Sequence, residues 1–129
     1  MTHVADLVAA ARARIDNLSP EAASDELRKG DVLLVDLREP TERAATGEIP
    51  GAIAIPRGML EFHADAASPY HREEFDPAKR VVLYCASGGR SALSGAALRD
   101  LGYEDVAHID GGIRGWIAAG LEVDPVGTA

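Results

Sequence analysis

Short runs of apolar residues recur along the chain and predict buried strands. The runs lack the polar alternation of a strand with one face in water; they lie at residues 32–36 (VLLVD), 51–56 (GAIAIP), 80–85 (RVVLYC) and 105–110 (DVAHID). Such runs are typical of strands that are covered on both faces, as in a parallel sheet. A further short strand is expected at about residues 15–18.

Helical signals lie between these runs. Apolar residues return every three or four positions from residue 4 to residue 15, which predicts an amphipathic first helix. In the segment SPEAASDELRKG, Ser19 is placed as an N-cap, Pro20 at the first helical position and Gly30 just past the helix end. Further helices are expected at residues 57–64, 90–101 and 112–119.

The alternation of strands and helices predicts one α/β domain with a mainly parallel sheet. Residues 64–79 form the one long irregular connection, and connections of that length are often functional. Gly111 and Gly112 indicate a tight turn into the last helix. In an open parallel sheet, ligands collect outside the carboxyl ends of the strands. Asp36 and Cys85 end two of the apolar runs and are therefore expected at that edge.

Composition narrows the class of protein. The chain has 129 residues, of which 47% are hydrophobic, enough for one core. Its formal net charge of −8 repels polyphosphate, so we expect no nucleic-acid partner. Aspartates and arginines interrupt the alanines of the first residues, so we expect neither a signal peptide nor a membrane partner, and a cytoplasmic location. A single cysteine excludes an intrachain disulfide.

That single cysteine, Cys85, precedes a loop of small residues and a predicted helix. A lone cysteine is often an inert core thiol. Here two adjacent glycines permit positive φ and let backbone N–H groups converge on one point. The helix start then adds its dipole, a guanidinium and a hydroxyl, which together favour the reactive thiolate. The candidate binding residues are Ala86, Ser87, Gly88, Gly89, Arg90 and Ser91.

These residues resemble the rhodanese sulfurtransferases, specifically their single-domain members. The loop CASGGRS is similar to the C-x-x-G-x-R-S form of the family's active-site loop. VDLREPTERAATGEIPGAIAIP resembles the family's upstream block, and HIDGGIRGWIAAGLEV its carboxyl-terminal signature. The resemblance covers about residues 19–123 as the rhodanese domain, with residues 1–18 as an amphipathic lead-in helix and 124–129 as a tail. It implies a parallel five-stranded sheet flanked by helices.

The resemblance also implies a reaction. Cys85 would accept a sulfane sulfur, become a persulfide, and pass the sulfur to cyanide or a thiol by a double displacement. The partners would be a small-molecule sulfur donor and a thiol acceptor, with no cofactor. Because Ala86, Ser87 and Gly89 are uncharged, we expect weak binding of the thiosulfate dianion. A low-molecular-weight or protein persulfide is the alternative donor.

Two alternative functions stay open at this point. One is a sulfur-binding or sensor module without turnover, and the other is a phosphatase or arsenate reductase of the same fold. Four residues separate Cys85 from Arg90, whereas those related phosphatases and reductases carry five and form a wider loop. A narrow loop suits a single sulfur atom better than a tetrahedral oxyanion. The intact cysteine favours an enzyme over a sensor.

Three further residues are candidates for supporting or binding roles. The resemblance places Asp36 and Arg38 near the active-site loop, where we expect them to support it through a salt bridge or hydrogen bonds. Arg57 is a candidate for reaching the substrate, although the default interpretation of its segment is a place in the core. No metal site is expected, because no metal-ligand spacing joins His3, His63, His71 and His108.

Overall fold

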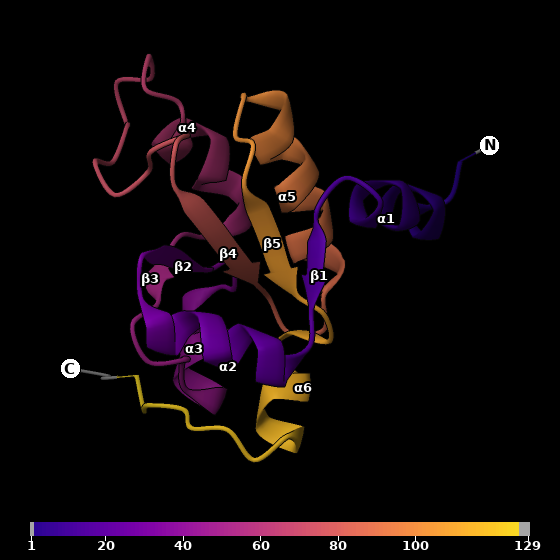
Figure 1. Cartoon of the computed structure of the whole chain (residues 1–129), viewed down its shortest axis with the longest axis vertical. Helices are drawn as coiled ribbons and strands as arrows, with labels where there is room; N and C mark the ends of the chain where they lie inside the picture. Colours follow the sequence, from indigo (N-terminus) through magenta and orange to yellow (C-terminus); the bar gives the residue numbers. More distant parts are fainter. Residues whose placement is uncertain (1, 127–129) are drawn as a thin grey trace.

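In the computed structural model, which describes residues 2–126, five strands form one parallel sheet in the order β1-β5-β4-β2-β3 (Figure 1). The strands are β1 (Asp16–Leu18), β2 (Val32–Asp36), β3 (Ile53–Ala54), β4 (Arg80–Tyr84) and β5 (Val106–Ile109). Four of them lie within the four apolar runs, and β1 lies within the short strand expected at about residues 15–18, so the expected parallel five-stranded α/β fold is confirmed. The order places β4 at the centre of the sheet.

Six α-helices are present among the described residues. They are α1 (Val4–Arg12), α2 (Pro20–Lys29), α3 (Pro40–Thr46), α4 (Leu60–Ala64), α5 (Gly89–Asp100) and α6 (Gly112–Ala118). The helix expected at residues 57–64 is divided into a 3₁₀ turn, η1 (Arg57–Met59), and α4. Helix α3 was not predicted, because it buries none of its side chains and so has no apolar stripe. Its start is held instead by a capping box between Glu39 and Glu42.

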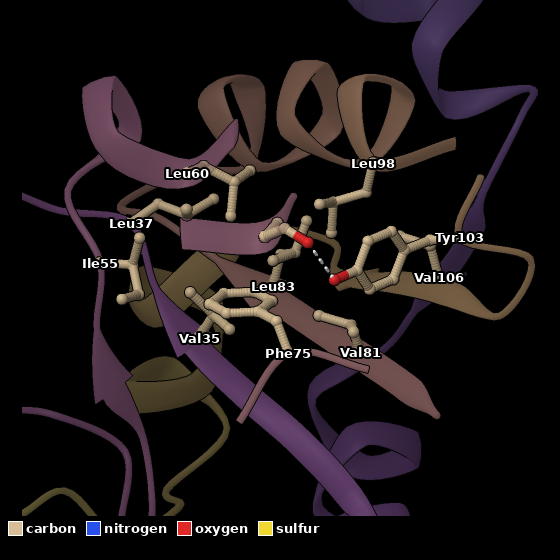
Figure 2. Close-up of a cluster of buried hydrophobic side chains, with 11 residues drawn as sticks. Val35, Leu37, Ile55, Leu60, Phe75, Val81, Leu83, Leu98, Tyr103 and Val106 are labelled. Atoms are coloured by element: carbon tan, nitrogen blue, oxygen red, sulfur yellow. Dashed lines mark hydrogen bonds between the residues drawn. The ribbon is translucent and has the colours of Figure 1, made fainter. Parts of the chain in front are cut away.

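The helices cover the two faces of the sheet. Side chains of α4 and α5 pack with Val81 and Leu83 on one face, and side chains of α2 and α6 pack with Val82 and Tyr84 on the other. Successive residues of β4 thus alternate between two cores. Figure 2 shows the first core, in which the Tyr103 hydroxyl donates to the backbone carbonyl of α4 at 2.8 Å. Helix α1 packs outside this layer against α5 (Figure 1).

The local signals at the helix and loop boundaries are confirmed. The Ser19 hydroxyl accepts a hydrogen bond from the backbone N–H of Ala22 at 3.1 Å, and α2 ends at Gly30 with φ of 75°. Residues 65–79 contain neither helix nor strand. Of the tail expected at residues 124–129, Asp124 forms an isolated antiparallel bridge with Glu48, and residues 127–129 lie outside the described part.

Within residues 2–126, every helix is too short or too polar to cross a membrane.

Candidate active site

Cys85 follows the central strand β4 at its carboxyl end and is buried, with 1% of its surface exposed. Its backbone carbonyl accepts a hydrogen bond from the N–H of Ile113 at 2.9 Å, and the carbonyl of Ala86 accepts one from Arg114 at 3.1 Å. Both donors belong to the first turn of α6. The start of the loop is therefore fixed to the start of α6.

Gly112 makes this close approach possible. A Cβ atom at this position would lie 2.5 Å from the carbonyl oxygens of both Cys85 and Ala86, and its φ of 61° also favours glycine. The expected tight turn at Gly111 and Gly112 is confirmed, with Gly111 as the N-cap of α6. The structure adds that the second glycine is needed by the loop of Cys85, a contact that the sequence pattern does not show.

The two glycines of the loop have different roles. Gly88 has φ of 113° and is the N-cap of α5, whereas Gly89 is the first residue of that helix and has open space where a Cβ would stand. The expectation that both glycines serve a positive φ is therefore correct for Gly88 alone.

The sulfur of Cys85 faces the start of α5. The backbone N–H of Gly88 donates to Sγ at 3.1 Å, and the thiol lies 3.6 Å from the hydroxyl oxygen of Ser91, within hydrogen-bond reach. Ala86 is half-buried and Ser87 is exposed. Several converging amides were expected, but within residues 2–126 the Gly88 amide is the single backbone donor that bonds to Sγ. This amide and the positive end of the α5 dipole favour negative charge on the sulfur.

Arg90 lies beside the sulfur but is paired with a carboxylate. Its two terminal nitrogens donate to the two carboxylate oxygens of Glu42, each at 2.8 Å. The pKa of Arg90 is raised, first by this hydrogen bonding and also by attraction to Cys85, while burial opposes it. The pKa of Glu42 is lowered to about 2, mainly by the hydrogen bond from Arg90. The guanidinium therefore shares its charge with an ionised carboxylate.

A small cavity opens next to this ion pair. It has a volume of about 210 Å³ and lies between α3 and α6, where Glu42, Ala45, Ala86, Ile113 and Ile117 contribute to its wall. Arg38, Thr46 and Arg114 complete the wall, so half of the lining residues are apolar and half are polar or charged. Arg114 is exposed. The cavity therefore combines an apolar surface with charged groups at its edge.

Asp36 and Arg38 form a buried pair beneath α3. Arg38 donates from Nε and Nη2 to the two carboxylate oxygens of Asp36 at 3.0 and 2.8 Å, and both side chains are at most 1% exposed. Arg38 also donates to the Thr46 hydroxyl at 2.7 Å and to the Gly47 carbonyl at 2.6 Å. Burial lowers the pKa of Arg38, but its hydrogen bonds and the charge of Asp36 raise it more. The pair thus fastens the end of α3 to the end of β2.

His108 was not predicted as a site residue, because the sequence suggested it only as a possible metal ligand. His108 is fully buried in β5, and its Nδ1 lies 2.8 Å from the Ser91 hydroxyl oxygen. Its Nε2 lies 2.7 Å from the side-chain oxygen of Asn17 on β1. Burial lowers the pKa of His108 to about 4. The available signal was a polar residue inside an otherwise apolar run, because buried polar groups almost always have partners.

Arg57 stands apart from the loop. Its Nη1 donates to the carboxylate of Glu61 at 2.7 Å, and in the described part of the chain no hydrogen bond joins it to residues 85–91. Contact between Arg57 and substrate therefore stays a prediction. Within residues 2–126, no group of three or more His, Cys, Asp or Glu side chains is arranged to hold a metal ion.

Comparisons with known proteins relate this chain to a family. The family model described as Rhodanese-like domain matches residues 19–119. A protein from Allochromatium vinosum named sulfurtransferase is 37% identical over 108 residues, which are 84% of this chain and 89% of that protein. Other curated relatives are longer, and the chain spans 26% and 49% of two of them.

Two solved structures are also similar. A protein of unknown function from Rhodopseudomonas palustris, described as a possible tyrosine phosphatase, is 37% identical with a TM-score of 0.90, and the match covers 96% of each chain. The polysulfide-sulfur transferase homodimer from Wolinella succinogenes is 33% identical with a TM-score of 0.75, and the match covers 94% of this chain and 86% of that one.

Proposed function

Because the chain belongs to the rhodanese-like domain family, we propose that it is a sulfurtransferase that carries a sulfane sulfur as a persulfide on Cys85. One observation carries the proposal. The single cysteine of the chain lies at the carboxyl end of the central strand, and its sulfur accepts the Gly88 amide hydrogen at 3.1 Å at the start of a helix. This is an environment that supports an anionic sulfur nucleophile.

The reaction proceeds in two displacements. In the first, the Cys85 thiolate attacks the outer sulfur of the donor, and a new S–S bond forms. The bond that held this sulfur to the rest of the donor breaks, and its electron pair stays with the rest of the donor. In the second, a thiolate or cyanide attacks the outer sulfur of the persulfide, and Cys85 leaves as the thiolate. The amide of Gly88 and the α5 dipole stabilise the negative sulfur in both steps.

We propose a persulfide as the sulfur donor and a thiol as the acceptor. The charge of Arg90 is already matched by the ionised carboxylate of Glu42, and Ala86 and Ser87 add none. Arg114 also lines the cavity but is exposed to solvent, which weakens its attraction for an anion. A dianion such as thiosulfate would therefore gain modest attraction and would meet the charge of Glu42. An organic persulfide, of low molecular weight or on a protein, carries less charge and suits the apolar wall of the adjacent cavity.

A phosphatase is the second candidate, because one similar solved structure is described as a possible tyrosine phosphatase. Phosphate binding would need the two terminal nitrogens of Arg90 as a fork. Both of them bond to Glu42 here, and four residues separate Cys85 from Arg90. The proposed sulfur chemistry needs neither a wider loop nor an unpaired guanidinium.

The test compares sulfur donors directly. The protein is incubated with thiosulfate, mercaptopyruvate or glutathione persulfide, and the mass of the chain is measured before and after addition of cyanide or a thiol. We expect the mass of one added sulfur atom, lost again on adding acceptor, with glutathione persulfide giving the highest kcat/KM. Cys85→Ser should fold and show neither change, whereas Lys29→Ala, an exposed substitution on α2, should behave as the wild type.

Other outcomes separate the alternatives. Sulfur that is loaded but not passed to any acceptor would indicate a sensor without turnover. Hydrolysis of an aryl phosphate that depends on Cys85, with no reaction from any sulfur donor, would replace the proposal by the phosphatase. Sulfur transfer that survives in Cys85→Ser would overturn the assignment, because the chain has no second thiol to hold a persulfide.

A further inference from the structure

A chain of side-chain hydrogen bonds connects the sulfur of Cys85 to the edge of the sheet. The thiol faces the Ser91 hydroxyl oxygen at 3.6 Å, that oxygen lies 2.8 Å from Nδ1 of His108, and Nε2 of His108 lies 2.7 Å from the side-chain oxygen of Asn17. Cys85, Ser91 and His108 are all buried. The chain crosses from β4 through α5 and β5 to β1.

The hydrogen bonds of Asn17 determine the tautomer of His108. The side-chain nitrogen of Asn17 donates to the backbone carbonyls of Arg12 at 3.0 Å and Ile15 at 3.3 Å. Its oxygen, which can only accept, therefore faces His108, and Nε2 must carry the hydrogen. In the neutral ring, Nδ1 is then an acceptor. Burial favours this neutral ring, as does the charge of Arg12, while Asp110 acts in the opposite direction.

The hydroxyl of Ser91 has one hydrogen and three neighbours that could take it. These are Nδ1 of His108 at 2.8 Å, the carbonyl oxygen of Gly88 at 3.2 Å and the sulfur of Cys85 at 3.6 Å. The shortest of the three distances joins the hydroxyl oxygen to Nδ1 of His108, the ring nitrogen that carries no hydrogen. With the hydrogen placed there, the oxygen of Ser91 turns a lone pair toward Cys85 and accepts the thiol hydrogen.

We propose that His108 is a positioning residue for the reaction at Cys85, because it holds the Ser91 hydroxyl hydrogen away from the sulfur. A hydrogen bond donated to the sulfur has two effects: it favours ionisation of the thiol, and it makes the thiolate a weaker nucleophile once it has formed. The Gly88 amide already serves ionisation. Held by His108, the Ser91 hydroxyl accepts from the protonated thiol and adds no second donor to the thiolate, so the sulfur electrons remain available for attack on the donor. The inference rests on the proposed function for its catalytic meaning, but its effect on sulfur reactivity can be measured without sulfur transfer.

The decisive measurement is a double-mutant cycle on the alkylation of Cys85 by iodoacetamide, with each rate taken on the high-pH plateau, where the thiol is fully ionised and only the nucleophilicity of the thiolate differs. His108→Leu releases the Ser91 hydroxyl to donate to the thiolate, so we expect the plateau rate to fall by about fivefold, because a thiolate that accepts a further hydrogen bond is a weaker nucleophile. In a Ser91→Ala background there is no hydroxyl to direct, so adding His108→Leu should change the rate less than about twofold. His63→Leu, which removes a half-buried histidine of α4 that takes no part in this chain of hydrogen bonds, should leave the rate unchanged.

His108→Asn provides the conservative variant. Its side-chain oxygen can accept the Ser91 hydrogen, so we expect it to recover most of the rate that His108→Leu loses. In sulfur transfer, His108→Leu should lower kcat and leave KM for the donor nearly unchanged, because the residue does not touch substrate. If sulfur transfer is absent in the wild type while the alkylation cycle still shows coupling, the proposed function fails and the positioning role stands.

Two results would overturn the inference. One is equal slowing by His108→Leu in the wild-type and Ser91→Ala backgrounds, which would indicate a purely structural effect. The other comes from nitrogen-15 NMR of the wild-type protein, which needs no variant to fold. We expect the Nε2–H tautomer of His108 at neutral pH, and a ring protonated on Nδ1 would refute the hydrogen-bond assignment.

Discussion

His108 should make the protein less stable in mild acid, because its imidazole is buried as the neutral ring. Its pKa is lowered from 6.5 to about 4, first by burial and further by the charge of Arg12, against the opposing charge of Asp110. Between these two values the unfolded chain binds a proton that the folded protein does not. The stability that depends on His108 is therefore complete above the unfolded pKa and is lost as the pH falls toward 4.

The size of the effect follows from the two pKa values. Each tenfold difference in proton affinity between the folded and unfolded states is worth about 1.4 kcal/mol. Between about pH 7 and about pH 4.5, protonation of the unfolded chain favours unfolding by nearly two factors of ten, so the free energy of unfolding should fall by about 2.5 kcal/mol. Glu42 and Asp110, whose pKa values are lowered, lose their contributions in more acidic solution than this range.

The assay is urea unfolding of the wild type and of His108→Asn at several pH values from about 7 to about 4.5. Asparagine does not titrate, so the difference between the two proteins isolates the histidine and cancels the shared carboxylates. We expect the wild type to lose about 2.5 kcal/mol more than the variant over this range. Parallel loss in both proteins would refute the conclusion that burial keeps His108 neutral.

Three further results are expected. Arg38→Met should lower the free energy of unfolding by about 3 kcal/mol, because the buried Asp36 loses its main cationic partner and keeps the Tyr84 hydroxyl at 2.8 Å and Arg43 at 3.5 Å. Urea unfolding should show part of this loss recovered when Asp36→Asn is added, and no recovery would contradict the pairing. Gly112→Ala should slow alkylation of the active-site thiol at least about tenfold, because the added Cβ would push away the backbone carbonyls of Cys85 and Ala86. Gly89→Ala, whose Cβ would meet open space, should leave the rate unchanged, and equal rates in the two variants would argue against the close approach of Gly112 to the loop. Glu42→Gln should lower KM for thiosulfate several-fold, and an unchanged KM in steady-state assays would show that its charge does not hinder dianions.

The strands and the position of the nucleophile were predictable because their signals are local. Residues 81–85 are apolar without alternation, since β4 is central and covered by helices on both faces. Cys85 and Gly88 were identified because a strand end, a positive φ and a helix start are encoded within a few adjacent residues. Helix α3 has no such local signal. It buries no side chain, so its sequence carries no apolar periodicity from which a helix could be predicted.

The partners of the catalytic residues were not predictable in this way. The guanidinium of Arg90 was expected to act at the loop, but no sequence pattern indicated that Glu42, 48 positions earlier, would bind both of its terminal nitrogens. Asp36 and Arg38 were expected near the loop, and Arg38 does line the same cavity as Ala86. That the two residues are also buried together and bonded to the end of α3 was not predicted. Such pairs are specified by where elements meet, and charged residues at these positions suit a solvated surface equally well.

By itself, the sequence determined that the chain forms parallel strands alternating with helices, and that one thiol stands at a strand end before a glycine-rich helix start. Those properties depend on burial periodicity and on backbone geometry over a few residues. Only the tertiary structure decided that Asn17, Ser91 and His108 would align behind that thiol. Their alignment requires β1, β5 and β4 to lie side by side, with the side chain of His108 facing α5. The strand order brings Asn17 and His108 together although they are 91 positions apart, and no local sequence pattern predicts this contact.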